Sequence, residues 1–257
     1  MSEGFSYRQR DYHDALAHDY DARGSHFLPR VNRNHYKKIK HIAVALRLSE
    51  HQEKDDLVLE VGVGTGLHAH WMIYNRPLRL VGGDISTQML AVAKRRLYAE
   101  IGSKFFPLCF NGQFLPFPDN AFDAVYCSAT LHHMECPLQT ILEMVRVVKP
   151  GKRVAIMEPN WIFPLNLAQG LFNKLERNVL QMRYHNLKRW GCQAGLRDLQ
   201  VQHFIYTPPF PKALLSWYDR VDDLAARIPV IRRFSVMVFL SGTKPLDDNY
   251  SGWAGVR

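Results

Sequence analysis

The feature that most constrains the fold of this chain is an apolar segment that runs directly into a glycine-rich turn. Residues 57–66 read Leu-Val-Leu-Glu-Val-Gly-Val-Gly-Thr-Gly, and a probable helix follows at residues 67–74. Glycine allows a tight turn, and it lets a ligand approach the backbone because no Cβ stands in the way. We therefore expect a strand–turn–helix unit with a ligand at the turn, a pattern that several nucleotide-binding families share.

Short apolar runs alternate with helical stretches along the rest of the chain. We predict strands at residues 57–61, 78–82, 104–109, 122–127, 153–157, 200–207 and 234–242, and helices that include residues 87–101 and 138–148. The first five strands are mostly apolar, as expected of parallel strands that are covered on both faces. Lys149-Pro150-Gly151 should end the preceding helix, because proline cannot continue it and glycine turns the chain. This alternation predicts an α/β fold.

Two segments lie outside this alternation. Residues 1–56 read as helical and partly exposed, and we predict an N-terminal lid or substrate element there, followed by a catalytic domain at residues 57–257. Residues 208–229 begin and end with proline around an apolar helix, which predicts a helical insertion at about residues 208–232, between the last two strands. The insertion either packs over the sheet edge or forms part of a substrate mouth.

Length and composition predict one large domain with a small appended element. The 257 residues are 47% hydrophobic, enough for a buried core. The sequence contains no run of eighteen apolar residues, so we predict no membrane span. Residues 1–10 lack the apolar core of a secretory signal. Cys109, Cys127, Cys136 and Cys192 show no metal-ligand spacing, so we expect free thiols and a cytoplasmic location.

The net charge of +9 is concentrated in residues 149–257, which carry 16 basic and 8 acidic residues. The cluster comprises Lys174, Arg177, Arg183, Lys188, Arg189 and Arg197. Such a patch attracts an anionic substrate, a membrane surface or nucleic acid, but most basic runs are solvated helix faces. No nucleic-acid-binding module is visible, so we predict no nucleic-acid partner.

Details of the glycine turn and of the second strand indicate the ligand. Leu67 stands where the nicotinamide fingerprint needs glycine, and no Lys-Ser/Thr pair follows the turn as in a phosphate-binding loop. Glu60 would repel a pyrophosphate and suits a ligand with an ammonium group and no phosphate, the character of S-adenosylmethionine. Asp84, 18 residues beyond Gly66, can accept hydrogen bonds from both ribose hydroxyls. The alternative role of Asp84, a helix N-cap, fits Ser86 better.

Five motifs together resemble the class I S-adenosylmethionine-dependent methyltransferases, in particular their type 11 small-molecule group. They are Glu60-x-Gly-x-Gly-x-Gly66, Asp84-Ile-Ser-x-x-Met89-Leu90, Leu115-Pro-Phe-Pro-Asp119-Asn-Ala-Phe-Asp123, Leu131-His-His133 and Glu143-x-x-Arg146-Val-Val-Lys-Pro-Gly151. The resemblance covers about residues 55–160 and returns weakly at residues 234–245. It implies a Rossmann-like, seven-stranded, mostly parallel sheet flanked by helices, with the last strand antiparallel. It also implies S-adenosylmethionine as cofactor, S-adenosylhomocysteine as product and no metal.

The resemblance assigns roles to matching positions. The implied cofactor-binding residues are Glu60, Gly62, Gly64, Gly66, Asp84, Ile85, Met89, Asn111, Gly112, Gln113 and Ser128. Glu60 would lie near the cofactor's amino group, and the glycines beside its methionine part. Asn111 departs from the family, which has an acidic residue there, but its carbonyl can still accept the adenine amino hydrogen bond. Tyr20, with Tyr12, would belong to a lid that closes on the cofactor.

The acceptor site is predicted from the residues that follow the fourth and fifth strands. Transfer to an oxygen needs alignment and a base near neutral pKa, and similar enzymes place a histidine there. His133, and next His132, are therefore candidate bases, with a structural role as the alternative. Glu158 could orient a histidine, bind an amine or cap the following helix.

The predicted reaction is O-methylation of a small molecule such as a secondary metabolite, a sugar or a lipid-linked intermediate. The alternatives are N-methylation of a small amine or peptide-derived natural product, and a non-catalytic protein that binds S-adenosylmethionine. An anionic or lipid-like acceptor, peripheral membrane contact, and a monomer or a homodimer all fit the sequence.

Overall fold

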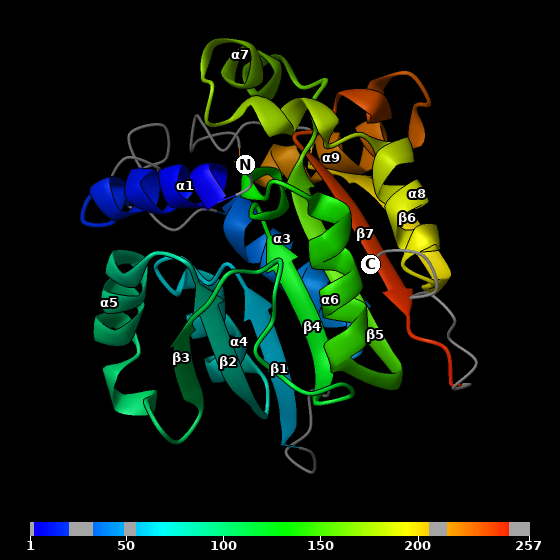
Figure 1. The fold of residues 1–257 in the computed structure, drawn as a ribbon. Coiled ribbons are helices and arrows are strands. Elements are labelled where there is room, and N and C mark those ends of the chain that lie inside the picture. The colour runs from blue at the N-terminus through cyan, green and yellow to red at the C-terminus, as the bar shows by residue number, and fades with distance from the viewer. Residues whose placement is uncertain (1–2, 21–32, 49–54, 206–214, 247–257) are drawn as a thin grey trace.

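A computed structural model of the protein describes residues 3–20, 33–48, 55–205 and 215–246. Seven strands form one sheet in the order β3-β2-β1-β4-β5-β7-β6 (Figure 1). The strands are β1 (Asp56–Val61), β2 (Leu78–Asp84), β3 (Phe105–Cys109), β4 (Phe122–Ser128), β5 (Val148–Pro159), β6 (Arg197–Phe204) and β7 (Met237–Thr243). The first five pair in parallel, while β7 runs antiparallel to both β5 and β6. The predicted Rossmann-like fold with an antiparallel last strand is confirmed.

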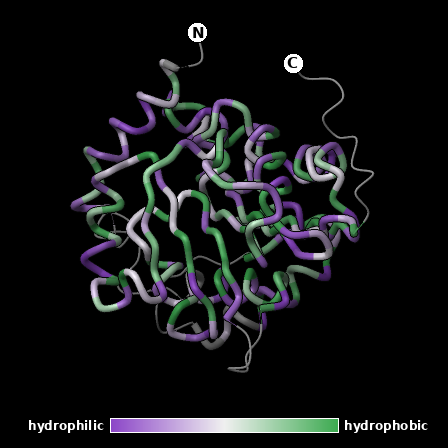
Figure 2. Tube along the Cα trace, turned by 60° about the horizontal axis from the view of Figure 1, so that its bottom comes forward, coloured by the Kyte–Doolittle hydropathy of each residue, from purple (hydrophilic) through white to green (hydrophobic). Residues whose placement is uncertain are grey.

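Helices cover both faces of the sheet. One face carries α3 (Arg33–Ala45), α4 (Leu67–Asn75) and α5 (Thr87–Arg96); the other carries α6 (Pro137–Val147) and α8 (Tyr184–Gln193). Successive residues of β1 supply these two cores in turn, with Val58 in one and Leu59 in the other. Apolar segments consequently run through the middle of the molecule, with hydrophilic segments mainly outside (Figure 2). This double burial explains why the strands lack a polar face.

Several element boundaries differ from the prediction. Strand β5 begins at Val148, because residues 149–152 form an irregularity in its pairing with β4 and Gly151 takes a φ of +74°. The helix predicted at residues 87–101 ends at Arg96 and is followed by a 3-10 turn, η1 (Tyr98–Glu100). Another 3-10 turn, η5 (Ile231–Phe234), occupies the predicted start of the last strand. Residues 206–207 of the predicted sixth strand lie outside the described residues.

The N-terminal helix α1 (Glu3–Leu16) lies above the strand ends and contacts α5 (Figure 1). The carboxylate of Asp14 accepts hydrogen bonds from Ser86 Oγ at 2.5 Å and from the Gln88 backbone N at 3.2 Å. On the same helix, Gln9 Nε2 donates to the Leu175 carbonyl at 2.7 Å. These contacts fix α1 over the carboxyl edge of the sheet, where ligands bind in such folds.

The C-terminal half adds further helices around this edge. Between β5 and α8 lie α7 (Pro164–Phe172) and a 3-10 segment, η3 (Arg177–Gln181). The described part of the predicted insertion contains α9 (Leu215–Arg227), whose Asp222 binds Lys37 of α3 at 2.7 Å. None of the helices among the described residues combines the length and apolar content that a membrane span requires.

Candidate active site

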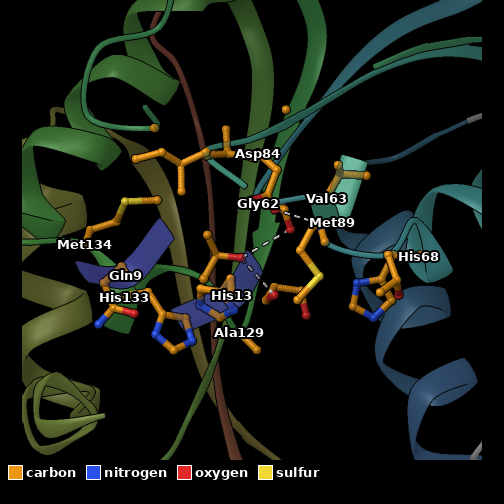
Figure 3. A pocket seen from close by; sticks show the side chains of 18 of the residues that line it. Gln9, His13, Gly62, Val63, His68, Asp84, Met89, Ala129, His133 and Met134 are labelled. Atoms are coloured by element: carbon orange, nitrogen blue, oxygen red, sulfur yellow. Dashed lines mark hydrogen bonds between the residues drawn. The ribbon is translucent and has the colours of Figure 1, made fainter. Parts of the chain in front are cut away.

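A cavity of about 470 Å³ lies at the carboxyl ends of β1, β2 and β4, beneath α1 (Figure 3). Its walls come from the glycine turn after β1, the end of β2, the loops after β3 and β4, and one face each of α1 and α3. Parallel strands bring these segments together, because their carboxyl ends share one edge of the sheet. Of the predicted residues, the cavity is lined by Tyr20, Gly62, Gly64, Asp84, Ile85, Met89, Asn111, Gly112, Ser128 and His133.

The glycine turn is fixed by its backbone conformation and by close neighbours. Gly62 and Gly66 have φ values of +76° and +77°, in the region that favours glycine. A Cβ on Gly62 would lie 2.2 Å from Thr130 Cγ2, so no side chain fits there. Gly66 approaches Ala93 of α5 and does not line the cavity. The prediction that Gly66 contacts the cofactor is therefore replaced by a packing role.

Asp84 ends β2 with its carboxylate at the cavity wall. Its oxygens accept hydrogen bonds from the backbone N atoms of Gly64 and Ser86, at 2.8 and 2.9 Å. Burial raises the pKa of Asp84 to about 6, although these two hydrogen bonds oppose the shift. Ser86 caps α5 by accepting from the Met89 backbone N, which leaves Asp84 to face the ligand.

Glu60 lies behind the cavity wall. Tyr126 Oη donates to its carboxyl group at 2.9 Å, and His68 Nδ1 lies 3.5 Å from the other oxygen. Burial raises the pKa of Glu60 to about 8, against the effect of the Tyr126 hydrogen bond. His68 itself lines the cavity, and burial, aided by the charge of Lys38, lowers its pKa to about 3. Glu60 itself does not line the cavity, and its expected place near the cofactor's amino group stays a prediction.

Glu158, at the end of β5, holds the 3-10 turn η2 (Leu131–His133) in place. One carboxylate oxygen accepts from the backbone N atoms of Thr130 and Leu131, at 2.9 and 2.8 Å. The other lies 2.6 Å from Nδ1 of His132, whose Nε2 is 3.4 Å from Glu176. Glu158 therefore orients a histidine, one of its three predicted roles, and it caps the earlier turn η2 instead of the helix that follows it.

His132 is buried and does not line the cavity. Burial acts to lower its pKa, but the carboxylates of Glu158 and Glu176 outweigh that effect and raise it to about 9. The ring is therefore protonated at neutral pH and has no lone pair to accept a proton. The prediction of His132 as an alternative base is wrong on this geometry.

His133 lines the cavity and has the opposite properties. Its ring centre lies 3.9 Å from that of His132, with the two planes tilted by 44°. It also meets the ring of His13 edge-on, at 4.6 Å between centres (Figure 3). Nδ1 is buried and has no hydrogen-bond partner among the described residues. Burial, together with the positive charges that His132 and His13 can carry, holds the pKa of His133 well below its usual range. A neutral imidazole with an available nitrogen therefore borders the cavity.

Two further predictions differ in detail from the structure. Gln113 does not line the cavity, because its side-chain oxygen accepts from the Cys136 backbone N at 2.6 Å. Asn111 does line it, but its carbonyl already accepts from the Gln113 backbone N at 3.0 Å. The carbonyl has a second lone pair, so it retains the capacity to bind an adenine amino group.

Sequence reasoning missed residues that folding brings to the cavity from outside the motifs. Ser6, Gln9 and His13 form one face of α1, at the three- and four-residue spacing of a helix. Lys38 comes from α3; burial lowers its pKa to about 8, although the charge of Glu158 acts in the other direction. The predicted N-terminal lid gave a general expectation that this segment covers the site, but it did not identify Ser6, Gln9 and His13 as the face of α1 that lines the cavity.

A group of side chains beside the cavity has the composition of a metal site. His132, His133 and Glu176 each offer a ligand atom, and these atoms lie within 4.8 Å of one another. Both nitrogens of His132 already face carboxylates, so the arrangement is accounted for without an ion. That the protein uses no metal stays a prediction.

The cavity matches a phosphate-free, cationic nucleoside. Asp84 offers a carboxylate to a ribose, and no atom lies within 4 Å of a Cβ built on Gly64, so the turn leaves its backbone open there. Arg96 borders the cavity, but its guanidinium hydrogen-bonds Thr65 in the glycine turn and so braces that turn. S-Adenosylmethionine fits this donor and acceptor set.

Comparisons with known proteins agree with this fit. Residues 59–156 match the family model described as a methyltransferase domain. A demethylmenaquinone methyltransferase of Symbiobacterium thermophilum is 30% identical over 216 residues, 80% of this chain and 80% of that protein. The ubiquinone/menaquinone biosynthesis C-methyltransferase of Francisella philomiragia is 33% identical over 109 residues, 41% of this chain and 43% of that protein.

Among solved structures, phosphoethanolamine N-methyltransferase 2 of Haemonchus contortus, in complex with S-adenosylmethionine, superimposes with a TM-score of 0.61 at 20% identity. The match covers 80% of this chain and 52% of that one, and at this identity it shows the shared fold alone. The relative from Symbiobacterium shares sequence over four fifths of both chains. This chain therefore belongs to the class I S-adenosylmethionine-dependent methyltransferases.

Proposed function

We propose that this methyltransferase acts on a small ring compound that carries a hydroxyl group, and that His133 accepts the hydroxyl proton. The observation that carries the proposal is the buried, unpartnered Nδ1 of His133 at the cavity. A general base must present a free lone pair within reach of the proton that it removes. The His133 ring lines the cavity and its Nδ1 has no hydrogen-bond partner among the described residues, whereas His132 is protonated between two carboxylates.

The order of residues along the sheet edge supports a role for His133 at the reacting end. Asp84 and Asn111, after β2 and β3, would hold the nucleoside, and the glycine turn after β1 would hold the methionine part. His133 follows β4, on the other side of β1 in the sheet. When bound, S-adenosylmethionine supplies an electrophilic methyl group, so the protein has only to align and deprotonate the acceptor.

Proton transfer to His133 serves methylation at carbon and at oxygen alike. The acceptor O–H bond breaks, its proton joins Nδ1 of His133, and the electron pair stays on oxygen. In carbon methylation the ring carbon beside that oxygen bonds to the methyl group as the C–S bond breaks. That carbon then releases its own proton to water, and the proton held by His133 returns to the oxygen. In oxygen methylation the oxygen forms the bond itself. S-Adenosylhomocysteine leaves in both cases.

Carbon methylation of a reduced quinone or similar ring is the outcome that the relatives favour. Two of them are named for demethylmenaquinone methylation and for C-methylation in quinone biosynthesis. The cavity lining includes the apolar residues Val61, Val63 and Met134, which suit a ring with a lipid-like substituent. Oxygen methylation, predicted from the sequence, is the second candidate because it uses the same base.

The predicted N-methylation is less well supported. An amine acceptor would be held by a carboxylate, and Glu158 was the candidate. That carboxylate accepts hydrogen bonds from η2 and faces His132, so it is not available to an amine.

The test is a product assay with a matched panel of acceptors. Purified protein would be incubated with methyl-labelled S-adenosylmethionine and a 1,4-naphthohydroquinone, a simple phenol or a primary amine, and products identified by mass spectrometry and NMR. We expect the hydroquinone to gain the label at ring carbon. Labelling of the amine alone would contradict the proposal, and calorimetry with S-adenosylhomocysteine would show independently that the cofactor site is intact.

A further inference from the structure

A second cavity, of about 740 Å³, lies where the loop after β5 meets α8, β6, α9 and η5. It shares no lining residue with the active-site cavity. Five of its lining residues are basic, namely Arg183, Arg232, Arg233, His185 and His203, and none is Asp or Glu. We call it the basic pocket. A concave site of one charge sign, with no acid in its lining, concentrates ions of the opposite sign.

Arg183 is held rigidly on one wall of the basic pocket. Its Nε donates to the Leu180 carbonyl at 3.0 Å, and its guanidinium lies 4.2 Å from the centre of the Trp161 ring. The Trp161 backbone N donates to the Met182 carbonyl at 3.3 Å, which holds the two segments that carry this pair side by side. The hydrogen bond to Leu180 uses Nε, so both terminal nitrogens can form the two parallel hydrogen bonds that phosphate accepts from arginine.

Arg232 and Arg233 supply positive charge from η5. Neither forms an ion pair with any residue in the described part of the chain, and both are exposed. Their charge reaches His203 on β6, where burial first, and then the two arginines, lower the pKa of the imidazole. His203 is also held by Ser235 Oγ at 3.1 Å and by stacking on Tyr184 at 5.5 Å. Within the described part of the chain, neither arginine of η5 is thus paired with a carboxylate.

The start of α8 adds to this field. Arg183 is its N-cap, no side chain caps the helix, and its first turn contains no acidic residue. The backbone N–H groups of a first turn have no partner within the helix and carry partial positive charge. Since Arg183, Tyr184 and His185 all line the basic pocket, the helix end complements the arginines.

We propose that the basic pocket binds a phosphate group, presented either by a soluble phosphate ester or by a lipid headgroup. The three arginines, the rigid Arg183–Trp161 pair and the uncapped start of α8 together carry the proposal. Phosphate binding would also explain part of the excess positive charge of the C-terminal half. The proposal does not depend on the identity of the methyl acceptor.

The test is a calorimetric titration of the protein with inorganic pyrophosphate at constant ionic strength. The variant Arg232→Gln/Arg233→Gln removes two charges from the pocket. The variant Lys188→Gln/Arg189→Gln removes two charges from the exposed face of α8, outside the lining. We expect saturable binding to the wild type, at least about tenfold weaker binding to the first variant and less than about twofold change in the second.

Two outcomes would overturn the proposal: no saturable binding to the wild type, or an equal loss in both variants, which would indicate general charge screening. Affinity for S-adenosylhomocysteine, measured on the same proteins, should be unchanged and shows that they are folded. Glycerol phosphate and phosphatidylcholine vesicles containing phosphatidic acid separate the two sources. Binding of glycerol phosphate supports a soluble ester, and recruitment to vesicles that fails in the first variant alone supports a headgroup.

Discussion

Two neighbouring histidines are held in opposite protonation states by what surrounds them. His132 lies between Glu158 and Glu176, and its pKa is raised to about 9. The ring of His133 lies against that charged ring at a tilt of 44°, lines the cavity and has a pKa well below its usual range. The protonated ring thus helps to keep its neighbour neutral, so His133 keeps a lone pair but is a weak base in the free protein.

Replacing His133 separates chemistry from cofactor binding. We expect His133→Gln to lower kcat about 100-fold or more, the range that general base catalysis contributes. Affinity for S-adenosylhomocysteine should change less than about twofold, because the cofactor contacts are elsewhere. The exposed His18→Gln serves as control. An unchanged kcat in His133→Gln would exclude this residue as the base.

Binding of the cofactor should release a proton from Glu60. Its pKa of about 8 means that this buried carboxyl is mainly protonated at pH 7 in the free protein. An ammonium group nearby favours the ionised form, so binding should expel the proton. Calorimetry with S-adenosylhomocysteine in buffers of different ionisation enthalpy measures the number of protons released.

We expect close to one proton from the wild type and far less from Glu60→Gln, which cannot ionise. Tyr126→Phe is the companion variant, because it removes the hydrogen bond to Glu60 but keeps the carboxyl group. Proton release by Tyr126→Phe should persist when the cofactor product binds. Equal proton release by wild type and Glu60→Gln would show that another group titrates.

At residue scale, the sequence could predict positions that lie within motifs and could not predict those that folding brings together. Asp84 and Ser128 reach the cavity as expected. Lys38 and His13 reach it from helices with no motif, since their placement depends on long-range packing. Gln113 fails for a related reason, because its side chain finds a backbone partner that only the folded loop supplies.

Among the elements, η2 depends on an ion pair that titrates. The folded-state pKa of His132, about 9, lies above the unfolded value near 6.5. Its charge therefore stabilises the fold fully below about pH 6.5, and this contribution is lost as the pH rises through about 9. Melting temperatures between pH 6 and 10 should fall more steeply for the wild type than for His132→Gln. Parallel curves for the two proteins would contradict this linkage.

Helix α1 should govern how long the cofactor stays bound. Asp14 attaches it to Ser86 and Gln88 at the start of α5. Asp14→Asn removes the charge from these bonds, and we expect dissociation of S-adenosylhomocysteine to become about five- to tenfold faster. The dissociation rate of S-adenosylhomocysteine can be measured by stopped-flow displacement. Asp11→Asn, which affects only an exposed contact with Arg10 on the same helix, is the control and should leave the rate unchanged.

Element existence was predictable, but several boundaries were not. Strand β5 starts at Val148 because its pairing with β4 accommodates residues 149–152, an irregularity that hydrophobic pattern does not record. Residues 231–234 have strand-like composition but form η5, and two arginines there remain exposed. The local hydrophobic pattern indicates which residues are buried, whereas the ends of strands and helices depend on pairing partners and on caps.

At the scale of the whole molecule, the two cavities divide between the predictable and the unpredictable parts of the chain. The active-site cavity gathers motif residues at the ends of β1, β2 and β4. The basic pocket is built from segments beyond residue 159, where no motif exists. The geometry at the sheet edge is fixed near the cofactor. Many arrangements of helices can cover the remainder of that edge, and the sequence pattern does not distinguish among them.

Ligand-induced stabilisation tests the whole assembly, because the active-site cavity draws on both N-terminal helices and four strand ends. A ligand that binds only the folded state adds about 2.7 kcal/mol at one hundred times its Kd. For a chain of 257 residues we expect S-adenosylhomocysteine to raise Tm by about 5–10 °C. Matched concentrations of NADH should give no shift, because Leu67 and Glu60 disfavour a dinucleotide. Asp84→Asn should lose most of the shift by weakening the ribose contact, whereas a full shift in that variant, or one produced by NADH, would be incompatible with the site described.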